Sequence, residues 1–113
     1  MSGITTHVLD TSRGRPASGV PILLETRKKR GWREIGQAVT DIDGRARQLL
    51  PEGYALTTGL YRLTFGVETY FKALGVEAFY PEASIVFHVR DANQHYHVPL
   101  LLSPYGYSTY RGS

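Results

Sequence analysis

The stretch Gly59-Leu60-Tyr61-Arg62-Leu63-Thr64-Phe65-Gly66 alternates apolar and polar residues between two glycines. Alternation with a period of two is typical of a β-strand that buries one of its faces. Glycines at both ends favour turns, because glycine readily leaves the extended conformation. We therefore expect a strand over residues 60–65, and similar patterns occur on both sides of it.

Six further segments have the composition of short strands, with turn residues such as 11–16 and 41–44 between them. These segments are 4–10, 20–27, 32–40, 85–89, 94–102 and 105–111. Pro21 cannot donate a hydrogen bond to a ladder, so it indicates an edge strand or an irregular start. Apolar residues at 70, 71 and 74, followed by Gly75, predict one short helix over 68–74. Seven or eight strands with one helix predict an all-β, antiparallel sandwich.

Composition limits the class of protein. A chain of 113 residues with 42% hydrophobic residues fits a single domain over 1–113, large enough for a core without disulfides. Thirteen Lys and Arg against ten Asp and Glu give a net charge of +3, which lacks the one-sided charge of a nucleic-acid binder. Without cysteine there is no thiolate site, and no apolar run reaches membrane-spanning or signal-peptide length. We expect a cytoplasmic protein with neither a nucleic-acid nor a membrane partner.

Histidine placement is the most informative local feature, because three of the four histidines fall between positions 88 and 97. His95 and His97 lie two apart on a predicted strand and therefore point to the same face, roughly 6.5–7 Å apart. For His88 and His95 we favour a partly buried side chain satisfied by a backbone group. The His95-Tyr96-His97 triplet has no neighbouring carboxylate in its strand, so a metal site is only weakly indicated and we predict none.

The C-terminal quarter combines an apolar strand with a tyrosine-rich end. Leu100-Leu101-Leu102 has no polar face, which predicts burial on both sides, with a second chain covering one of them. Residues 105–111 alternate and carry three tyrosines and an arginine. Two interpretations remain open for the terminus: an edge strand with a frayed end, or a segment that shapes a functional site.

Three groups of residues together resemble a known family: His7-Val8-Leu9-Asp10, Asp43-Gly44-Arg45, and segment 95–113, which ends in Tyr110-Arg111-Gly112-Ser113. Over essentially its whole length the chain resembles the 5-hydroxyisourate hydrolases, transthyretin-related enzymes of urate breakdown. The resemblance implies a transthyretin-like β-sandwich of two four-stranded sheets with one short helix. It also implies a homotetramer whose dimer–dimer interface forms a channel that holds the active sites.

The same resemblance implies a set of site residues and a reaction. The residues carried over by motif are His7, Arg45 and His97 as catalytic groups, with Ser108, Tyr110 and Arg111 as further substrate contacts. His88 and His95 are not carried over, and no cofactor is implied. The reaction converts 5-hydroxyisourate to 2-oxo-4-hydroxy-4-carboxy-5-ureidoimidazoline by adding water across a cyclic amide. We hypothesise that one imidazole takes a proton from water while Arg45 polarises substrate oxygens; which histidine is the base stays open.

A carrier function is the alternative. The hormone-carrying transthyretins resemble this chain in fold but lack the histidines, the arginine and the terminal tetrapeptide. Imidazoles and a guanidinium suit an oxygen-rich purine derivative better than a hydrophobic hormone. The sequence therefore favours the enzyme over a carrier of thyroid-hormone-like aromatics in the same channel.

Overall fold

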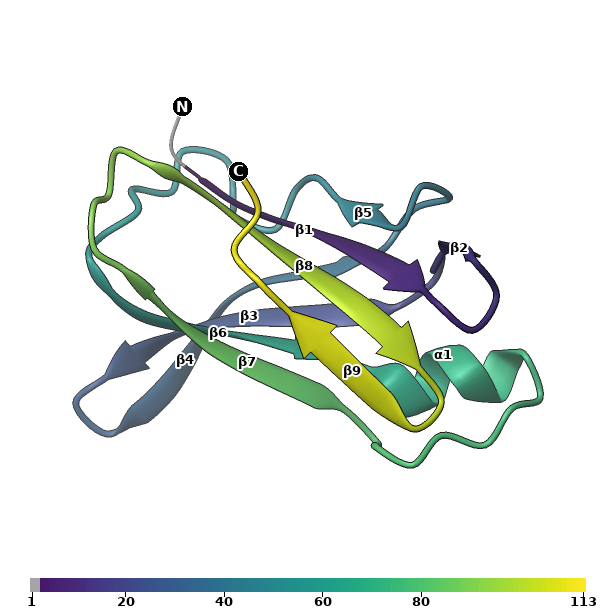
Figure 1. The fold of residues 1–113 in the computed structure, drawn as a ribbon. Coiled ribbons are helices and arrows are strands. Elements are labelled where there is room, and N and C mark those ends of the chain that lie inside the picture. Colours follow the sequence, from purple (N-terminus) through teal and green to yellow (C-terminus); the bar gives the residue numbers. More distant parts are fainter. Residues whose placement is uncertain (1–2) are drawn as a thin grey trace.

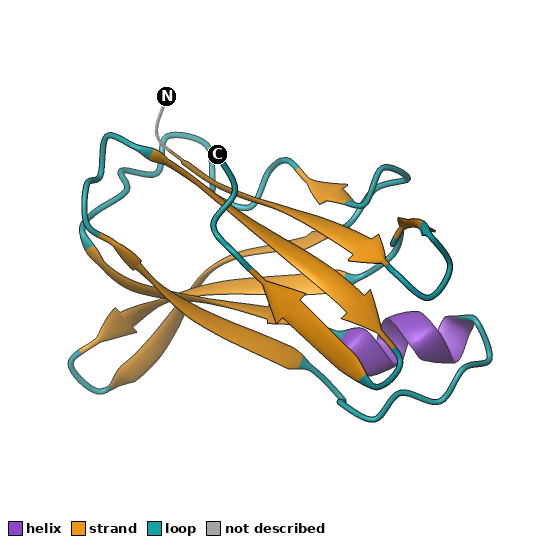
Figure 2. Cartoon of the chain, in the orientation of Figure 1, coloured by secondary structure: helices purple, strands orange, loops and turns teal. Residues whose placement is uncertain are grey.

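In the computed structural model, which describes residues 3–113, two β-sheets pack face to face (Figures 1 and 2). The first sheet has the order β4-β3-β6-β7, formed by Gly31–Val39, Pro21–Lys28, Gly59–Phe65 and Ala83–Val89. The second has the order β2-β1-β8-β9, formed by Arg15–Pro16, Gly3–Asp10, His95–Ser103 and Gly106–Thr109, and β5 (Arg45–Ala46) also pairs with β1. Helix α1, Val67–Ala73, follows β6. The predicted β-sandwich with one short helix is confirmed.

Several details differ from the sequence-based expectation. The two-residue strands β2 and β5 make the second sheet five-stranded, and they are too short to show a period. Of the two alternatives offered for Pro21, the edge strand is excluded, because β3 lies inside its sheet, and Pro21 is the first residue of that strand. As the first residue of β3, Pro21 interrupts no ladder, and its carbonyl accepts the Gly66 N–H at 2.8 Å. The last strand ends at Thr109, two residues earlier than expected.

The alternation predicted for 60–65 sets the core. Tyr61, Leu63 and Phe65 are fully buried and face the second sheet, where Val8 and Leu100 are fully buried as well. Along β1, the even-numbered residues are buried and the odd-numbered ones are half-buried. The odd-numbered residues of β1 therefore point to the side of the second sheet that is turned away from the sandwich, which we call the outer face.

A buried carboxylate fixes the helix to the second sheet. Asp10 is fully buried at the end of β1, and its Oδ2 accepts the Tyr70 hydroxyl of α1 at 2.8 Å. Its Oδ1 accepts the Ser12 hydroxyl at 2.6 Å and the Ser12 N–H at 3.0 Å. Burial and the Asp10 contact raise the pKa of Tyr70, so the phenol stays a donor. Within residues 3–113 no helix is long and apolar enough to cross a membrane.

The pairing of β1 with β8 positions the site. These two strands run parallel, which is a departure from the purely antiparallel sandwich that we expected. Their register places Thr5 opposite His97 and His7 opposite Pro99. Because side chains opposite one another in register point to the same face, the outer face gathers residues from both ends of the chain.

Candidate active site

The outer face collects three of the residues that the sequence singled out. His7 lies on β1, Arg45 is its register partner on β5, and His97 lies on β8 beside them. Ser108 of β9 is the partner of Leu101, an outer-face residue of β8 two positions beyond Pro99. The structure thus brings His7, Arg45 and His97 together, with Ser108 farther along the same face.

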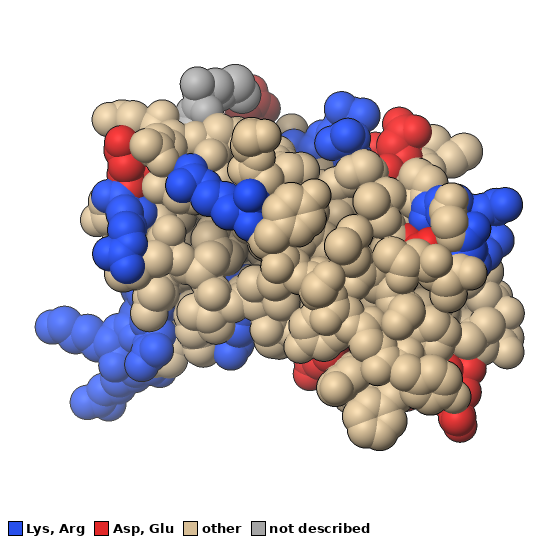
Figure 3. Space-filling view, in the orientation of Figure 1, with Lys and Arg blue, Asp and Glu red and all other residues tan. Residues whose placement is uncertain are grey.

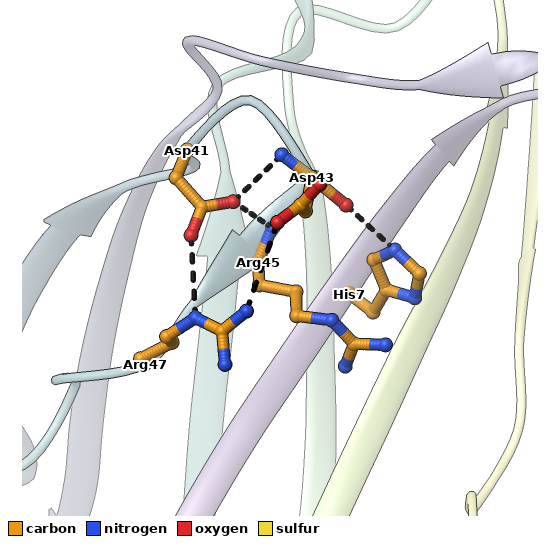
Figure 4. A network of polar contacts seen from close by, with 5 residues as sticks. All are labelled: His7, Asp41, Asp43, Arg45 and Arg47. Carbon is orange, nitrogen blue, oxygen red and sulfur yellow. Dashed lines mark hydrogen bonds and ion pairs between the residues drawn. The ribbon is translucent and has the colours of Figure 1, made fainter.

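The turn before Arg45 is held by one carboxylate (Figure 4). Asp41 Oδ1 accepts the backbone N–H of Asp43 at 2.9 Å and that of Arg45 at 3.0 Å, and Oδ2 lies 3.5 Å from Nε of Arg47. These hydrogen bonds, the one from Arg45 foremost, and the Arg47 guanidinium lower the pKa of Asp41. The lowered pKa favours the ionised carboxylate, which accepts both N–H groups of the turn.

Gly44 presses this turn against β1. Its φ is +77°, its carbonyl accepts the Val8 N–H at 2.8 Å, and an added Cβ would run into the Val8 carbonyl oxygen. Only glycine fits such a conformation at such a short approach. The neighbouring Asp43 carbonyl is thereby placed 2.7 Å from Nε2 of His7. Because a carbonyl only accepts, Nε2 carries the proton, and a neutral His7 has a free lone pair on Nδ1.

His97 is held along both edges of its ring. Nδ1 lies 2.8 Å from the Thr5 hydroxyl, while the opposite edge faces Gly112 so closely that an added Cβ would sit 2.5 Å from Cδ2. The Gly112 N–H also donates to the His97 carbonyl at 2.8 Å. Since Nδ1 and Cδ2 are both bonded to Cγ, Nε2 and Cε1 are the ring atoms farthest from the backbone.

Charge and burial favour the neutral form of His97. Burial is the main cause that lowers its pKa below the usual value, and Arg45, His7 and His95 each lower it further. The imidazole can therefore act as a base near neutral pH, as the sequence-based hypothesis on Arg45 expected.

The C-terminal tail returns to the sheet instead of fraying. Pro99 has no N–H for the strand beside it, so the β8–β9 ladder stops at Thr109, whose hydroxyl donates to the Pro99 carbonyl at 2.7 Å. The chain rejoins β8 through a bridge between Gly112 and His97. This return contradicts the frayed end, and a role of the terminus in a functional site stays a prediction.

In the single chain, the side chains of Tyr110 and Arg111 make their contacts away from the site on the outer face. The Arg111 guanidinium lies 4.6 Å from the centre of the Tyr96 ring and donates to Gln94 at 3.0 Å. Tyr110 is 57% exposed. Both line a cavity of about 470 Å³ that also contacts Ile85, Phe87 and Val98. Their predicted contact with substrate stays a prediction.

Sequence reasoning missed Thr5 and the carbonyl of Asp43, which hold the two imidazoles. Thr5 gives no signal of its own, because its role depends on a strand register that the sequence does not encode locally. Within residues 3–113, no three His, Asp or Glu side chains gather in a way that could hold a metal ion.

Comparison with known proteins agrees with this geometry. The model of the HIUase/Transthyretin family matches residues 4–112. The chain belongs to this family. It is 51% identical to a probable 5-hydroxyisourate hydrolase of Caenorhabditis elegans, over 99% of this chain and 82% of the relative.

Two solved structures show how far the fold extends across the family. The 5-hydroxyisourate hydrolase of Klebsiella pneumoniae superposes with a TM-score of 0.86 at 36% identity, covering 99% of this chain and all of the other. Sea bream transthyretin in complex with thyroxine superposes with a TM-score of 0.89 at 31% identity, covering 96% and 93%. Because enzyme and hormone-binding structures fit almost equally well, the fold alone does not choose between them.

The effect of Arg45 on His97 can be measured directly. We expect the pKa of His97 to lie below 6.5 and to rise in Arg45→Met, because the guanidinium no longer opposes imidazolium. We expect only a partial rise of this pKa, because burial of the ring continues to lower it. NMR titration of the histidine ring protons reports it, and Arg47→Met, which removes an exposed arginine from the same turn, is the control. A pKa of His97 equal in Arg45→Met and wild type would contradict the assignment.

Proposed function

We propose that this protein hydrolyses 5-hydroxyisourate, opening a cyclic amide of the purine-derived ring. The observation that carries the proposal is the convergence of two imidazoles and one guanidinium on the outer face, with each imidazole held by a backbone or hydroxyl contact. The family relationship, with 51% identity to a probable hydrolase of this substrate, supports it. No cofactor is needed for addition of water to an amide.

The proposed chemistry needs a base, an oxyanion partner and a proton donor. An imidazole nitrogen takes a proton from water, and the water oxygen bonds to the amide carbon as the negative charge moves to the carbonyl oxygen. Arg45 faces this developing charge and stabilises it. The carbon–nitrogen bond then breaks while the leaving nitrogen receives the Nδ1 proton of His7 in its imidazolium form, and the Nε2 proton of His7 stays hydrogen-bonded to the Asp43 carbonyl. We assign the base to His97, because its pKa is lowered and its Thr5 contact uses Nδ1, which leaves Nε2 outside that hydrogen bond.

The carrier alternative fits this surface less well. Hydrogen-bonded imidazoles and an arginine recognise oxygen-rich groups, whereas a hydrophobic hormone gains from apolar walls. Tight binding of thyroxine combined with no effect on 5-hydroxyisourate would favour the carrier.

We further propose that the protein is a homotetramer and that a second dimer covers the outer face. Leu9 and Leu101 are half-buried on this face of the single chain, whereas their neighbours Leu100 and Leu102 are buried in the sandwich. Figure 3 shows that the surface over β8 and β9 carries few charged side chains, which gather at its margins. A surface with few charges and with partly exposed leucines is typical of contacts between subunits. Ser108 and the 110–113 tail would then form walls of the enclosed channel.

Replacing either imidazole by a neutral amide tests the catalytic roles. We expect His7→Asn and His97→Asn each to lower kcat/KM for freshly generated 5-hydroxyisourate by about 100-fold or more, the usual loss when general acid–base catalysis is removed. Ultraviolet absorbance follows the substrate, with its spontaneous decay subtracted. His88→Asn, an exposed imidazole on β7, is the matched control. Wild-type protein that does not accelerate the decay would refute the proposed function.

The close contact between the tail and His97 gives a second test. Gly112→Ala should displace the His97 ring and lower kcat/KM roughly 10- to 100-fold, because small displacements of catalytic groups cost rates of that order. Gly106→Ala is the control, since its new Cβ would meet only the Ser103 hydroxyl, at 3.8 Å. Equal activity of both variants would remove the tail from the site.

The assembly is tested by placing a charge on the outer face. Leu101→Glu should separate the tetramer into smaller species and abolish most activity, because an unpaired carboxylate would be buried between subunits. Val39→Glu, which changes a residue that is 62% exposed on the other sheet, should leave both properties intact. Light scattering after gel filtration measures the mass. A tetramer that persists in Leu101→Glu would place the interface elsewhere.

A further inference from the structure

Thr5 stands between two imidazoles. Its hydroxyl oxygen lies 2.8 Å from Nδ1 of His97 and 2.8 Å from Nε2 of His95. The three side chains form a continuous hydrogen-bonded row along the outer face, running from His97, half-buried in the single chain, to His95, exposed at the start of β8. This row leads away from His7 and Arg45, so the hydrolysis described above does not use it.

The single hydroxyl proton couples the two rings. A hydroxyl donates one hydrogen bond, so when Thr5 donates to one imidazole the other must donate to Thr5. If His97 donates through Nδ1, its Nε2 is unprotonated, which is the state required of a base. Thr5 then donates to Nε2 of His95, and the proton of a neutral His95 resides on Nδ1.

We propose that Thr5 and His95 form a relay that carries the proton taken up by His97 out to solvent. The inference rests on the proposed hydrolysis, with His97 as base. When Nε2 of His97 accepts a proton from water, the ring becomes an imidazolium. Its Nδ1–H bond breaks as a new O–H bond forms on Thr5, and the original Thr5 O–H bond breaks as an N–H bond forms on Nε2 of His95. His95 then releases its Nδ1 proton to water, so protons and charge balance.

The surroundings give the relay a direction. His97 is half-buried beside Arg45 and His7, both of which oppose a positive charge on its ring. His95 lies at the exposed end of the row, where water solvates a cation. Transfer from His97 to His95 therefore moves positive charge from an unfavourable site to a favourable one. Thr5 and His95 act through His97, so both are positioning and proton-transfer residues that do not touch substrate.

The first test removes only the hydroxyl. Thr5→Val keeps the shape of the side chain but cannot relay a proton, and we expect kcat for 5-hydroxyisourate to fall at least about 10-fold. Thr5→Ser keeps the hydroxyl and should stay within about threefold of wild type. Thermal unfolding of each variant checks that the fold is retained. Wild-type kcat in Thr5→Val, or equal losses in the valine and serine variants, would overturn the relay.

The second test replaces the missing proton acceptor from solution. His95→Ala should lose kcat about as much as Thr5→Val, and added imidazole should restore it in a concentration-dependent, saturable way. Thr5→Val should not be restored, because the link to His97 is missing. His88→Ala and an enzyme-free sample control for other effects of imidazole. A His95→Ala defect that imidazole leaves unchanged would overturn the relay, whereas inactivity of the wild type would instead refute the proposed function.

Discussion

The parallel pairing of β1 with β8 is the constraint on which the site depends. Eight consecutive residue pairs, from Gly3 with His95 to Asp10 with Leu102, hold together strands from opposite ends of the chain. Because side chains alternate, a slip of one residue would turn His97 into the core and a buried valine onto the outer face. The hydrophobic core that fixes this register therefore also fixes the site. Asp10, at the end of β1, adds a buried hydrogen bond that ties the same strand to α1.

Backbone contacts, more than side-chain pairs, then set the orientation of the imidazoles. Gly44 brings a turn onto β1 so that a carbonyl meets His7, and Gly112 brings the tail onto the edge of the His97 ring. In both places the absence of a side chain creates the contact, and Pro99 releases the tail from the ladder just before it. A site held by backbone is stiff, which is what catalysis by preorganised groups requires.

The sequence was enough to predict the strands, the helix and the sandwich, because alternation and turn residues are local signals. The resemblance to a family supplied His7, Arg45 and His97, which the structure brings onto one face. What could not be predicted depends on contacts between distant residues. Thr5 and His97 are 92 positions apart, and no local sequence pattern in either strand indicates that the two residues lie opposite each other. The parallel direction of β1 and β8 and the two-residue strands could not be predicted for the same reason.

The long separation between β1 and β8 also has a kinetic consequence. Hairpins such as β3–β4 and β8–β9 join neighbouring segments, whereas the β1–β8 ladder must close a loop of most of the chain. Loop-closure entropy delays such contacts, and proteins rich in them fold on timescales of roughly milliseconds to seconds. We expect the hairpins to form early and the outer face to be completed late. The surface on which activity depends would then be the last part of the molecule to acquire its native shape, and the first to reveal a folding defect.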